Sequence, residues 1–127
     1  MATYFVMLCI LLYIYKMNET FVTNWKSQVK KGTLTFIILN VLKNNEYYGY
    51  ELIEQIRKHT EIEIAEGTLY PLMNRLKTEE LVESKWVEQE TGIPRKYYSL
   101  TEAGIETLVQ MNMYWENLEK SIKKIIQ

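Results

Sequence analysis

An uncharged apolar stretch opens the chain, and a helical pattern of apolar positions follows it. From Ala2 to Tyr15 no side chain is charged, whereas charged and polar residues are frequent from Lys16 onward. Across residues 26–43 apolar side chains recur three or four positions apart, the spacing of one buried helix face; they are Leu34, Ile37, Ile38, Val41 and Leu42. The pattern predicts a first helix over residues 26–43.

Two shorter helices are predicted next. Residues 50–60 carry Leu52, Ile53 and Ile56 on one side, and the break before them falls at residues 48–49. A third helix places its apolar side chains at positions 0, 3, 4 and 7, namely Leu69, Leu72, Met73 and Leu76. Proline is best tolerated in the first turn of a helix. The proline at position 71 therefore predicts that this helix starts near residue 67 or 68.

The pattern then changes from helix to strand. Apolar and polar positions alternate over residues 82–88, a turn with Gly92 and Pro94 follows, and residues 95–100 form the return strand. Three helices followed by a hairpin is the layout of a winged helix-turn-helix. We therefore expect a mainly α fold with a small β-hairpin, in which the third helix enters the DNA major groove.

A last helix is predicted from Thr101 to about residue 126. Thr101 is a typical N-cap, and Glu102 suits the positive end of the helix dipole. Apolar residues then repeat at alternating steps of three and four, as in a helix-pairing seam; they are Leu108, Met111, Trp115, Leu118, Ile122 and Ile125. Since two-fold dimers are the commonest homo-oligomers, we expect a second copy of the chain to cover this seam.

Composition and charge exclude several classes of protein. The chain has 127 residues, a formal net charge of −1 and one cysteine, so a broadly basic binder and a disulfide framework are excluded. Cys9 is expected to be a buried, inert thiol, and the only histidine, His59, to close the second helix. No catalytic or metal-binding spacing occurs, so we expect no enzyme activity, no cofactor and no metal site.

Three interpretations of residues 2–15 are open. The run is shorter than the 18–20 or so apolar residues that span a bilayer, and no signal-peptide features flank it. It is a short membrane anchor, an extra helix packed on the body or on a partner, or the product of a start placed too early, with the native chain beginning at Met17. We favour the start at Met17, and hence a cytoplasmic, nucleoid-associated protein. The predicted domains are an apolar extension (1–16), a winged-helix domain (17–100) and a dimerisation helix (101–127).

Three stretches resemble the PadR family of bacterial transcriptional regulators. They are YYGYELIEQI (residues 47–56), EGTLYPLMNRLKTEELV (66–82) and GIPRKYYSLTEAG (92–104), which occur in the family's order and spacing. The resemblance implies a dimeric winged-helix repressor with a C-terminal dimerisation helix and inverted operator half-sites. It further implies release of DNA on binding a small aromatic or hydrophobic compound, such as a phenolic acid or, for shorter members, a planar drug.

One position departs from the family pattern. The family usually has Gly-Arg-Pro before the wing strand, whereas this chain has Gly92-Ile93-Pro94. One cationic contact between the wing and phosphate is therefore missing. Residues 1–16 also lie outside the family pattern.

The expected DNA-binding residues are cations and polar side chains around the third helix and the wing. Phosphate contacts supply most of the affinity of DNA binding, and contacts with base edges supply its specificity. Tyr70 is expected to touch phosphate, whereas Tyr98 is expected to pack inward. The full set is Lys30, Lys31, Thr68, Tyr70, Asn74, Arg75, Lys77, Arg95 and Lys96.

The expected effector site lies on the dimer seam. Trp115 sits in the middle of the seam, where it either lines a slot for a flat ligand or fills the dimer core. Met111 is polarizable and adaptable, which suits varied ligands, and Trp25 is expected to complete the pocket. The rival function for the whole chain is a winged-helix module whose third helix binds protein instead of DNA, and a further one is a membrane-tethered regulator.

Overall fold

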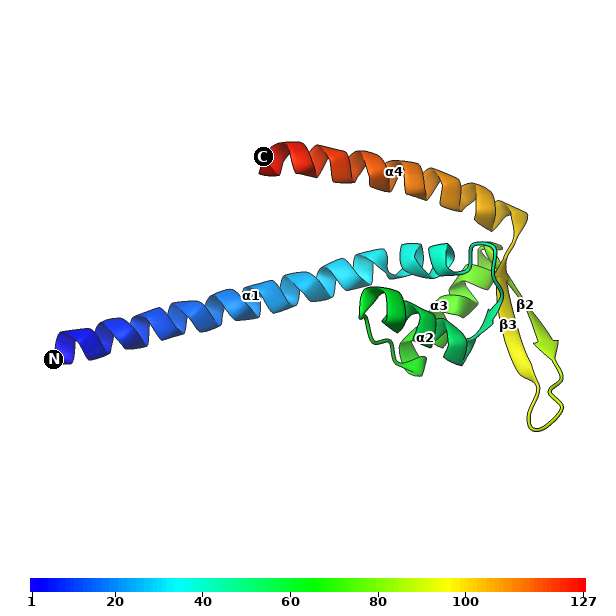
Figure 1. Ribbon diagram of the computed structural model, residues 1–127, viewed down its shortest axis with the longest axis horizontal. Coiled ribbons are helices and arrows are strands. Elements are labelled where there is room, and N and C mark those ends of the chain that lie inside the picture. Colours follow the sequence, from blue (N-terminus) through cyan, green and yellow to red (C-terminus); the bar gives the residue numbers. More distant parts are fainter. The chain divides into compact units, whose positions relative to one another are not determined.

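The computed structural model describes all 127 residues and has four helices and three short strands (Figure 1). The helices are α1 (Ala2–Val41), α2 (Gly49–Thr60), α3 (Glu66–Thr78) and α4 (Glu102–Ile126), and the strands are β1 (Tyr47–Tyr48), β2 (Val82–Val87) and β3 (Arg95–Leu100). Two compact units divide the chain, Met1–Leu34 and Thr35–Gln127. The predicted fold class, mainly helical with a small β-element, is confirmed.

The first helix is much longer than the apolar pattern predicted. α1 runs from Ala2 to Val41, so the predicted start at residue 26 is wrong. Residues 2–31 contain neither proline nor glycine, and polar side chains that interrupt an apolar face leave the backbone helix intact. Thr20, for example, donates its hydroxyl hydrogen to the Lys16 carbonyl at 3.0 Å.

Nothing in the chain covers the N-terminal part of α1. Every residue from Met1 to Gly32 is exposed. This includes Cys9, so the expectation of a buried thiol is wrong for the single chain. None of these residues therefore contributes a side chain to the core of the protein.

The core lies in the unit Thr35–Gln127, between the helices and the sheet. Each helix of the winged-helix body contributes side chains that are almost fully buried, and α4 adds one. They are Ile38, Leu39 and Leu42, Leu52 and Ile56, Leu69, Met73 and Leu76, and then Val82, Tyr98 and Leu108. The predicted apolar faces of α2 and α3 are confirmed, while Leu39, outside the predicted face of α1, is buried as well.

The sheet has a strand that the sequence pattern did not predict. β1 pairs with β3 in antiparallel register, Tyr47 opposite Tyr98 and Tyr48 opposite Tyr97. β2 pairs with the other side of β3, from Val82 opposite Leu100 to Val87 opposite Arg95. Residues 48–49 were predicted to be a break and no strand was predicted here, because two residues are too few to show the alternation of a strand.

α3 begins slightly before its predicted start. Its first turn closes at Ala65, whose carbonyl accepts hydrogen bonds from the backbone N–H groups of Thr68 and Leu69, each at 3.0 Å. The helix therefore starts at Glu66, and Pro71 lies in its second turn. There the missing N–H of Pro71 removes one helical hydrogen bond without ending the helix.

The start of α4 is fastened to the end of α3. The predicted N-cap is confirmed, since the Thr101 hydroxyl oxygen accepts from the Gly104 N–H at 2.9 Å. The same hydroxyl donates to the Glu80 carbonyl at 2.6 Å. A Cβ at Gly104 would collide with the Leu81 carbonyl oxygen, so only glycine allows this close approach.

Candidate nucleic-acid interface

α3 presents a polar face on the side opposite its buried apolar face. Leu69, Met73 and Leu76 hold the helix against the core. Thr68, Asn74 and Arg75 are exposed as a result. α2 and α3 are consecutive helices joined by a short loop, as in a helix-turn-helix, so the exposed side of α3 is the surface that such folds offer to a major groove.

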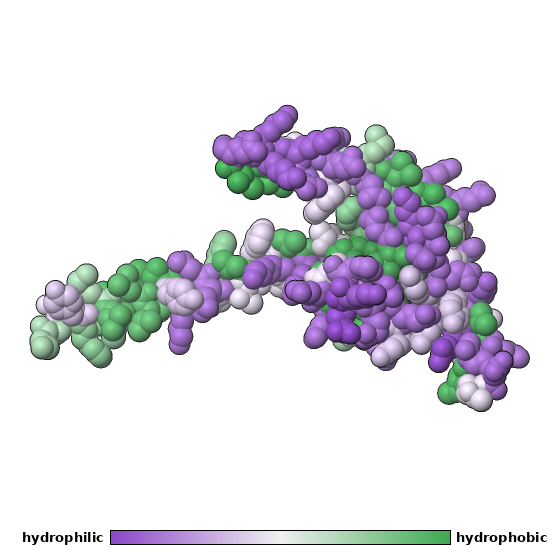
Figure 2. Space-filling model, viewed as in Figure 1, coloured by the Kyte–Doolittle hydropathy of each residue, from purple (hydrophilic) through white to green (hydrophobic).

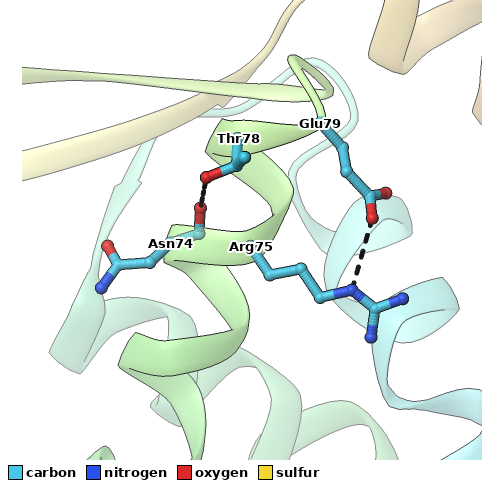
Figure 3. A network of polar contacts seen from close by, with 4 residues as sticks. All are labelled: Asn74, Arg75, Thr78 and Glu79. Carbon is cyan, nitrogen blue, oxygen red and sulfur yellow. Dashed lines mark hydrogen bonds and ion pairs between the residues drawn. The ribbon is translucent and has the colours of Figure 1, made fainter.

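The polar side chains of α3 differ in whether another group of the chain already bonds to them (Figure 3). Arg75 reaches the Glu79 carboxylate at 3.4 Å, and the Thr78 hydroxyl donates to the Asn74 carbonyl at 3.0 Å. The side-chain amide of Asn74 points away from that pair and bonds to no other group of the chain. Asn74 is thus free to pair with a base edge, whereas a phosphate must compete with Glu79 for Arg75.

Two lysines from different elements lie beside each other where α3 meets the wing. Lys77 belongs to the last turn of α3 and Lys96 to β3. Burial first, and then the nearby charge of Lys77, lower the pKa of Lys96. The ammonium group of Lys96 also stands 5.7 Å from the ring centre of Trp86 on β2. Neither lysine has a carboxylate partner, so their charges oppose each other until an anion such as a phosphate binds.

The wing carries one more cation and an apolar tip. The Arg95 guanidinium lies 4.4 Å from the ring centre of Tyr48, which holds it by a cation–π contact without neutralising it. Ile93 at the tip is 83% exposed, next to Gly92 with its positive φ of 100°. The tip therefore offers no positive charge to a phosphate, as the Gly-Ile-Pro sequence predicts.

The two tyrosines predicted to differ in role do differ in burial. Tyr98 is 2% exposed, and burial raises the pKa of its hydroxyl, which confirms that it packs inward. Tyr70 is 40% exposed, and its ring lies against Gly49 at the start of α2, where a Cβ would collide with the tyrosine hydroxyl. Tyr70 thus helps to pack α2 against α3, and its contact with phosphate stays a prediction.

Three predicted residues belong to the other compact unit. Trp25, Lys30 and Lys31 are exposed on α1 within Met1–Leu34. Their assignment to DNA and effector binding stays a prediction. His59 lies in the last turn of α2, as expected, and is exposed.

A second exposed surface of the C-terminal unit is apolar and lies on α4. Along the predicted seam Leu108 is buried in the chain itself, while the residues from Trp115 onward are exposed: Trp115 39%, Leu118 38%, Ile122 45% and Ile125 83%. Figure 2 shows apolar side chains along one side of the C-terminal part of α4. Leu108 therefore serves the core of its own chain, and the uncovered stripe runs from Trp115 to Ile125.

An aromatic contact that the sequence pattern did not predict joins α1 to this stripe. The ring centres of Phe36 and Trp115 lie 5.4 Å apart, and the Asn112 amide donates to the side-chain oxygen of Asn40 at 3.1 Å. Phe36 lies off the predicted buried face of the first helix. A large aromatic side chain on the side away from the core was the one sequence signal for this contact.

Comparison with known proteins identifies the family. The match to the transcriptional regulator PadR-like family covers residues 38–110, more than half of the chain. The chain belongs to the PadR-like family. The matched residues run from the end of α1 through α2, α3 and the wing to the first part of α4, and they end before Trp115.

Two proteins from other bacteria resemble this one over most of its length. An uncharacterised protein of Lysinibacillus sphaericus is 31% identical over 99 residues, which cover 76% of this chain and 91% of that protein. The transcriptional regulator YqjI of Escherichia coli is 32% identical over 94 residues, which cover 72% of this chain and 44% of YqjI.

Solved structures of PadR-like regulators share the fold. A PadR family transcriptional regulator from Eggerthella lenta has a TM-score of 0.76 at 32% identity, covering 86% of this chain and 95% of that one. A PadR-like regulator from Bacillus cereus has a TM-score of 0.72 at 34% identity, with coverages of 79% and 97%. This PadR-like chain is therefore a DNA-binding transcriptional regulator with a winged-helix fold.

The site contains two residues that the sequence analysis missed. Trp86 stands beside the ammonium of Lys96, and Tyr48 stands beside the guanidinium of Arg95. Trp86 is 67% exposed at an outward-facing strand position, a place where a large aromatic side chain signals a contact surface. The partnership of Tyr48 with Arg95 depends on β1, which no sequence pattern predicted.

Proposed function

We propose that this PadR-like regulator is a cytoplasmic homodimeric repressor that leaves its operator when a flat aromatic or hydrophobic compound binds at the dimer seam. The observation that carries the DNA-binding part of the proposal is the pair of unneutralised lysines, Lys77 on α3 and Lys96 on β3. Such a pair is destabilising alone and favourable around a phosphate, so it supports a DNA backbone contact at the junction of α3 and the wing.

The residues on α3 divide into two roles. Lys77, Lys96 and Arg95 hold phosphates and set the position of the protein on the duplex. Asn74, whose amide is free, reads a base, and asparagine pairs bidentately with adenine. Thr68 lies on the same exposed side, where its methyl group suits the methyl of thymine.

The α4 stripe supports a dimer. An apolar stripe from Trp115 to Ile125, each of whose residues is at least 38% exposed, is typical of a subunit interface, and its steps of three and four suit pairing with another helix. A second copy brings a second α3, so the pair reads two inverted half-sites. Residues 17–100 then form the DNA-binding part and residues 101–127 the dimerisation part.

The effector site is proposed around Trp115 and Met111. In a two-fold dimer a residue near the axis meets its own copy, which gives a flat slot between two indole rings. Phe36 already lies against Trp115 with its ring tilted, so a ligand in this slot touches α1 of the winged helix as well as α4. A ligand that favours one angle between the two subunits changes the spacing of the two α3 helices and hence the affinity for DNA.

The proposed function is tested by selecting bound DNA from random sequence. The proposal predicts an inverted repeat whose half-sites lie about 34 Å, one helical turn, apart. The selected DNA should bind two chains in sedimentation, and a planar aromatic compound should release it. A single half-site bound by one chain, or no enriched sequence at all, would contradict the proposal.

A further inference from the structure

The start of α1 is apolar on every side and exposed on every side. Residues 2–15 carry no charge, and all of them are exposed in the chain. Figure 2 shows this part of α1 mostly in green and pale colours, without the deep purple of charged residues. By length and composition α1 is the one helix apolar enough to cross a membrane. The winged-helix function uses none of these residues.

The distribution of apolar side chains around the helix indicates whether another helix or a lipid bilayer covers this surface. A second helix would cover one stripe, for which Tyr4, Leu8, Leu11 and Tyr15 have the right steps of four, three and four. That pairing leaves the remaining sides uncovered, with Phe5, Ile10 and Leu12 among them, each at least half exposed. A helix that is apolar all round needs an environment that surrounds it, and a lipid bilayer is one.

The end of the segment next to Lys16 fits the boundary between lipid and water. Tyr13 and Tyr15 stand at this end, and tyrosine favours the interface between lipid and water. The next stretch is basic, with Lys16, Lys26, Lys30 and Lys31 against one acid, Glu19. Lysines near an apolar segment mark its cytoplasmic end and are attracted to anionic lipid headgroups.

We propose that residues 2–15 insert into the lipid bilayer from the cytoplasmic side and tether the winged helix to the membrane surface. At about 1.5 Å per residue the segment is about 21 Å long, enough to pass the middle of a hydrocarbon layer of about 30 Å. Lys16 lies at the headgroups, and the continuous helix of residues 16–41 connects the anchor to the DNA-binding body. This inference takes the membrane-anchor interpretation of residues 2–15 over a start at Met17. It stands apart from the proposed repressor function, since the buried core of the winged helix contains none of these residues.

Cys9 is a built-in probe of insertion, because it is the only cysteine and lies in the middle of the segment. The full chain is mixed with vesicles of phosphatidylethanolamine and phosphatidylglycerol, floated on a density gradient and treated with a charged maleimide. The thiolate that reacts with maleimide exists in water and not in hydrocarbon. We expect the protein to float, to stay bound in high salt, and to label at Cys9 at least ten-fold more slowly than without vesicles.

A matched pair of variants separates insertion from charge attraction. Leu8→Lys with Leu11→Lys places two lysines in the apolar segment, and each should lower the partition into vesicles roughly a hundred-fold. Thr20→Lys with Ser27→Lys adds the same charge in the polar part of α1 and should float like the unchanged chain. DNA binding and circular dichroism of each variant verify that the winged helix is folded.

Two outcomes would overturn the proposal. If the full chain stays at the bottom of the gradient with intact vesicles, residues 2–15 do not insert. If it floats but Cys9 labels as fast as in solution, the lysines alone hold it at the surface. Fast labelling of Cys9 is also the result expected if two copies of the chain pair through Leu8 and Leu11 instead of inserting into lipid. In such a pair Cys9, the residue after Leu8, points away from the seam and stays in water.

Discussion

The two halves of α4 are parts of one helix with opposite surroundings. In the first half Thr101 caps the helix, Gly104 touches the backbone of Leu81, and Leu108 is 2% exposed in the core of its own chain. In the second half the same apolar spacing continues, but Leu118 and Ile122 are 38% and 45% exposed. One spacing thus serves two purposes, folding at the start of α4 and, as we propose, assembly at its end.

The family match follows the same division. It covers residues 38–110 and so includes the buried half of α4 and not the exposed half. The part that the family match covers is the body of the winged helix with the buried start of α4. The later half of α4, with Trp115, is the part in which we expect this regulator to differ from others in its partner contacts and its effector.

The largest effect is expected from a charge in the exposed half. Leu118→Glu puts an unpaired carboxylate into the proposed subunit interface, which costs several kcal/mol of dimer stability. Sedimentation should show a folded monomer whose DNA affinity has fallen with the loss of the second half-site. Asn117→Glu, which adds the same charge beside the stripe, should stay dimeric. A dimer of unchanged strength in Leu118→Glu would remove the stripe from the interface.

The next largest effect concerns the buried half. Leu108→Ala opens a cavity in the core and should lower the free energy of unfolding by about 2–5 kcal/mol. Ile105→Ala is the matched control, because Ile105 lies one turn earlier on α4 and is 51% exposed; it should change the free energy by about 0.5 kcal/mol or less. Urea denaturation measures both. Equal losses of stability in the two variants would mean that the side of α4 with Leu108 is no more important to the core than the exposed side with Ile105.

Trp115, which lies at the border between the two halves of α4, gives a third test. Planar compounds and phenolic acids should quench the fluorescence of Trp115 and weaken DNA binding by about 1–3 kcal/mol, with DNA weakening ligand binding by the same factor. Trp115→Phe keeps an aromatic ring beside Phe36, whereas Trp115→Ala removes it and should abolish both effects. Because Trp25 and Trp86 also fluoresce, a quench that survives in Trp115→Ala would place the ligand elsewhere.

A smaller effect, confined to particular sequences, is expected on α3. Asn74→Ala should lose about 1–3 kcal/mol on the operator at the base pair that it reads, and little on random DNA. Competition binding to operator variants measures the discrimination at each position. An equal loss on operator and random DNA would show that Asn74 only positions the protein.

Much of the fold could be predicted because its signals are local. The apolar faces of α2 and α3, the alternation of β2 and β3 and the cap at Thr101 each appear within a few residues of sequence. The start of α1 could not be predicted from the buried face, since an exposed helix needs no such face to continue. β1 could not be predicted because its only partner, β3, is about 50 residues away in sequence and only the register of Tyr47 with Tyr98 reveals it.

The candidate site was predictable as a set of residue types and not as an arrangement. The cations of α3 and the wing follow from the sequence, but the proximity of Lys77 and Lys96 depends on how α3 lies against the sheet. The pairing of Arg75 with Glu79 is the reverse case, since a spacing of four on a helix suggests it directly. Local spacing thus indicates which charges are neutralised, whereas only the fold shows which ones are left together.

The most direct test of the account is the salt dependence of operator binding for the two neighbouring lysines. Lys77→Ala and Lys96→Ala should each weaken binding to every sequence and reduce the slope of log affinity against log salt by about 0.9. Lys123→Ala is the control, since Lys123 pairs with Glu119 at 3.2 Å on α4 and should leave the slope unchanged. Slopes that match the unchanged protein in both lysine variants would contradict a DNA contact at the junction of α3 and the wing, and would favour a winged helix that binds protein there.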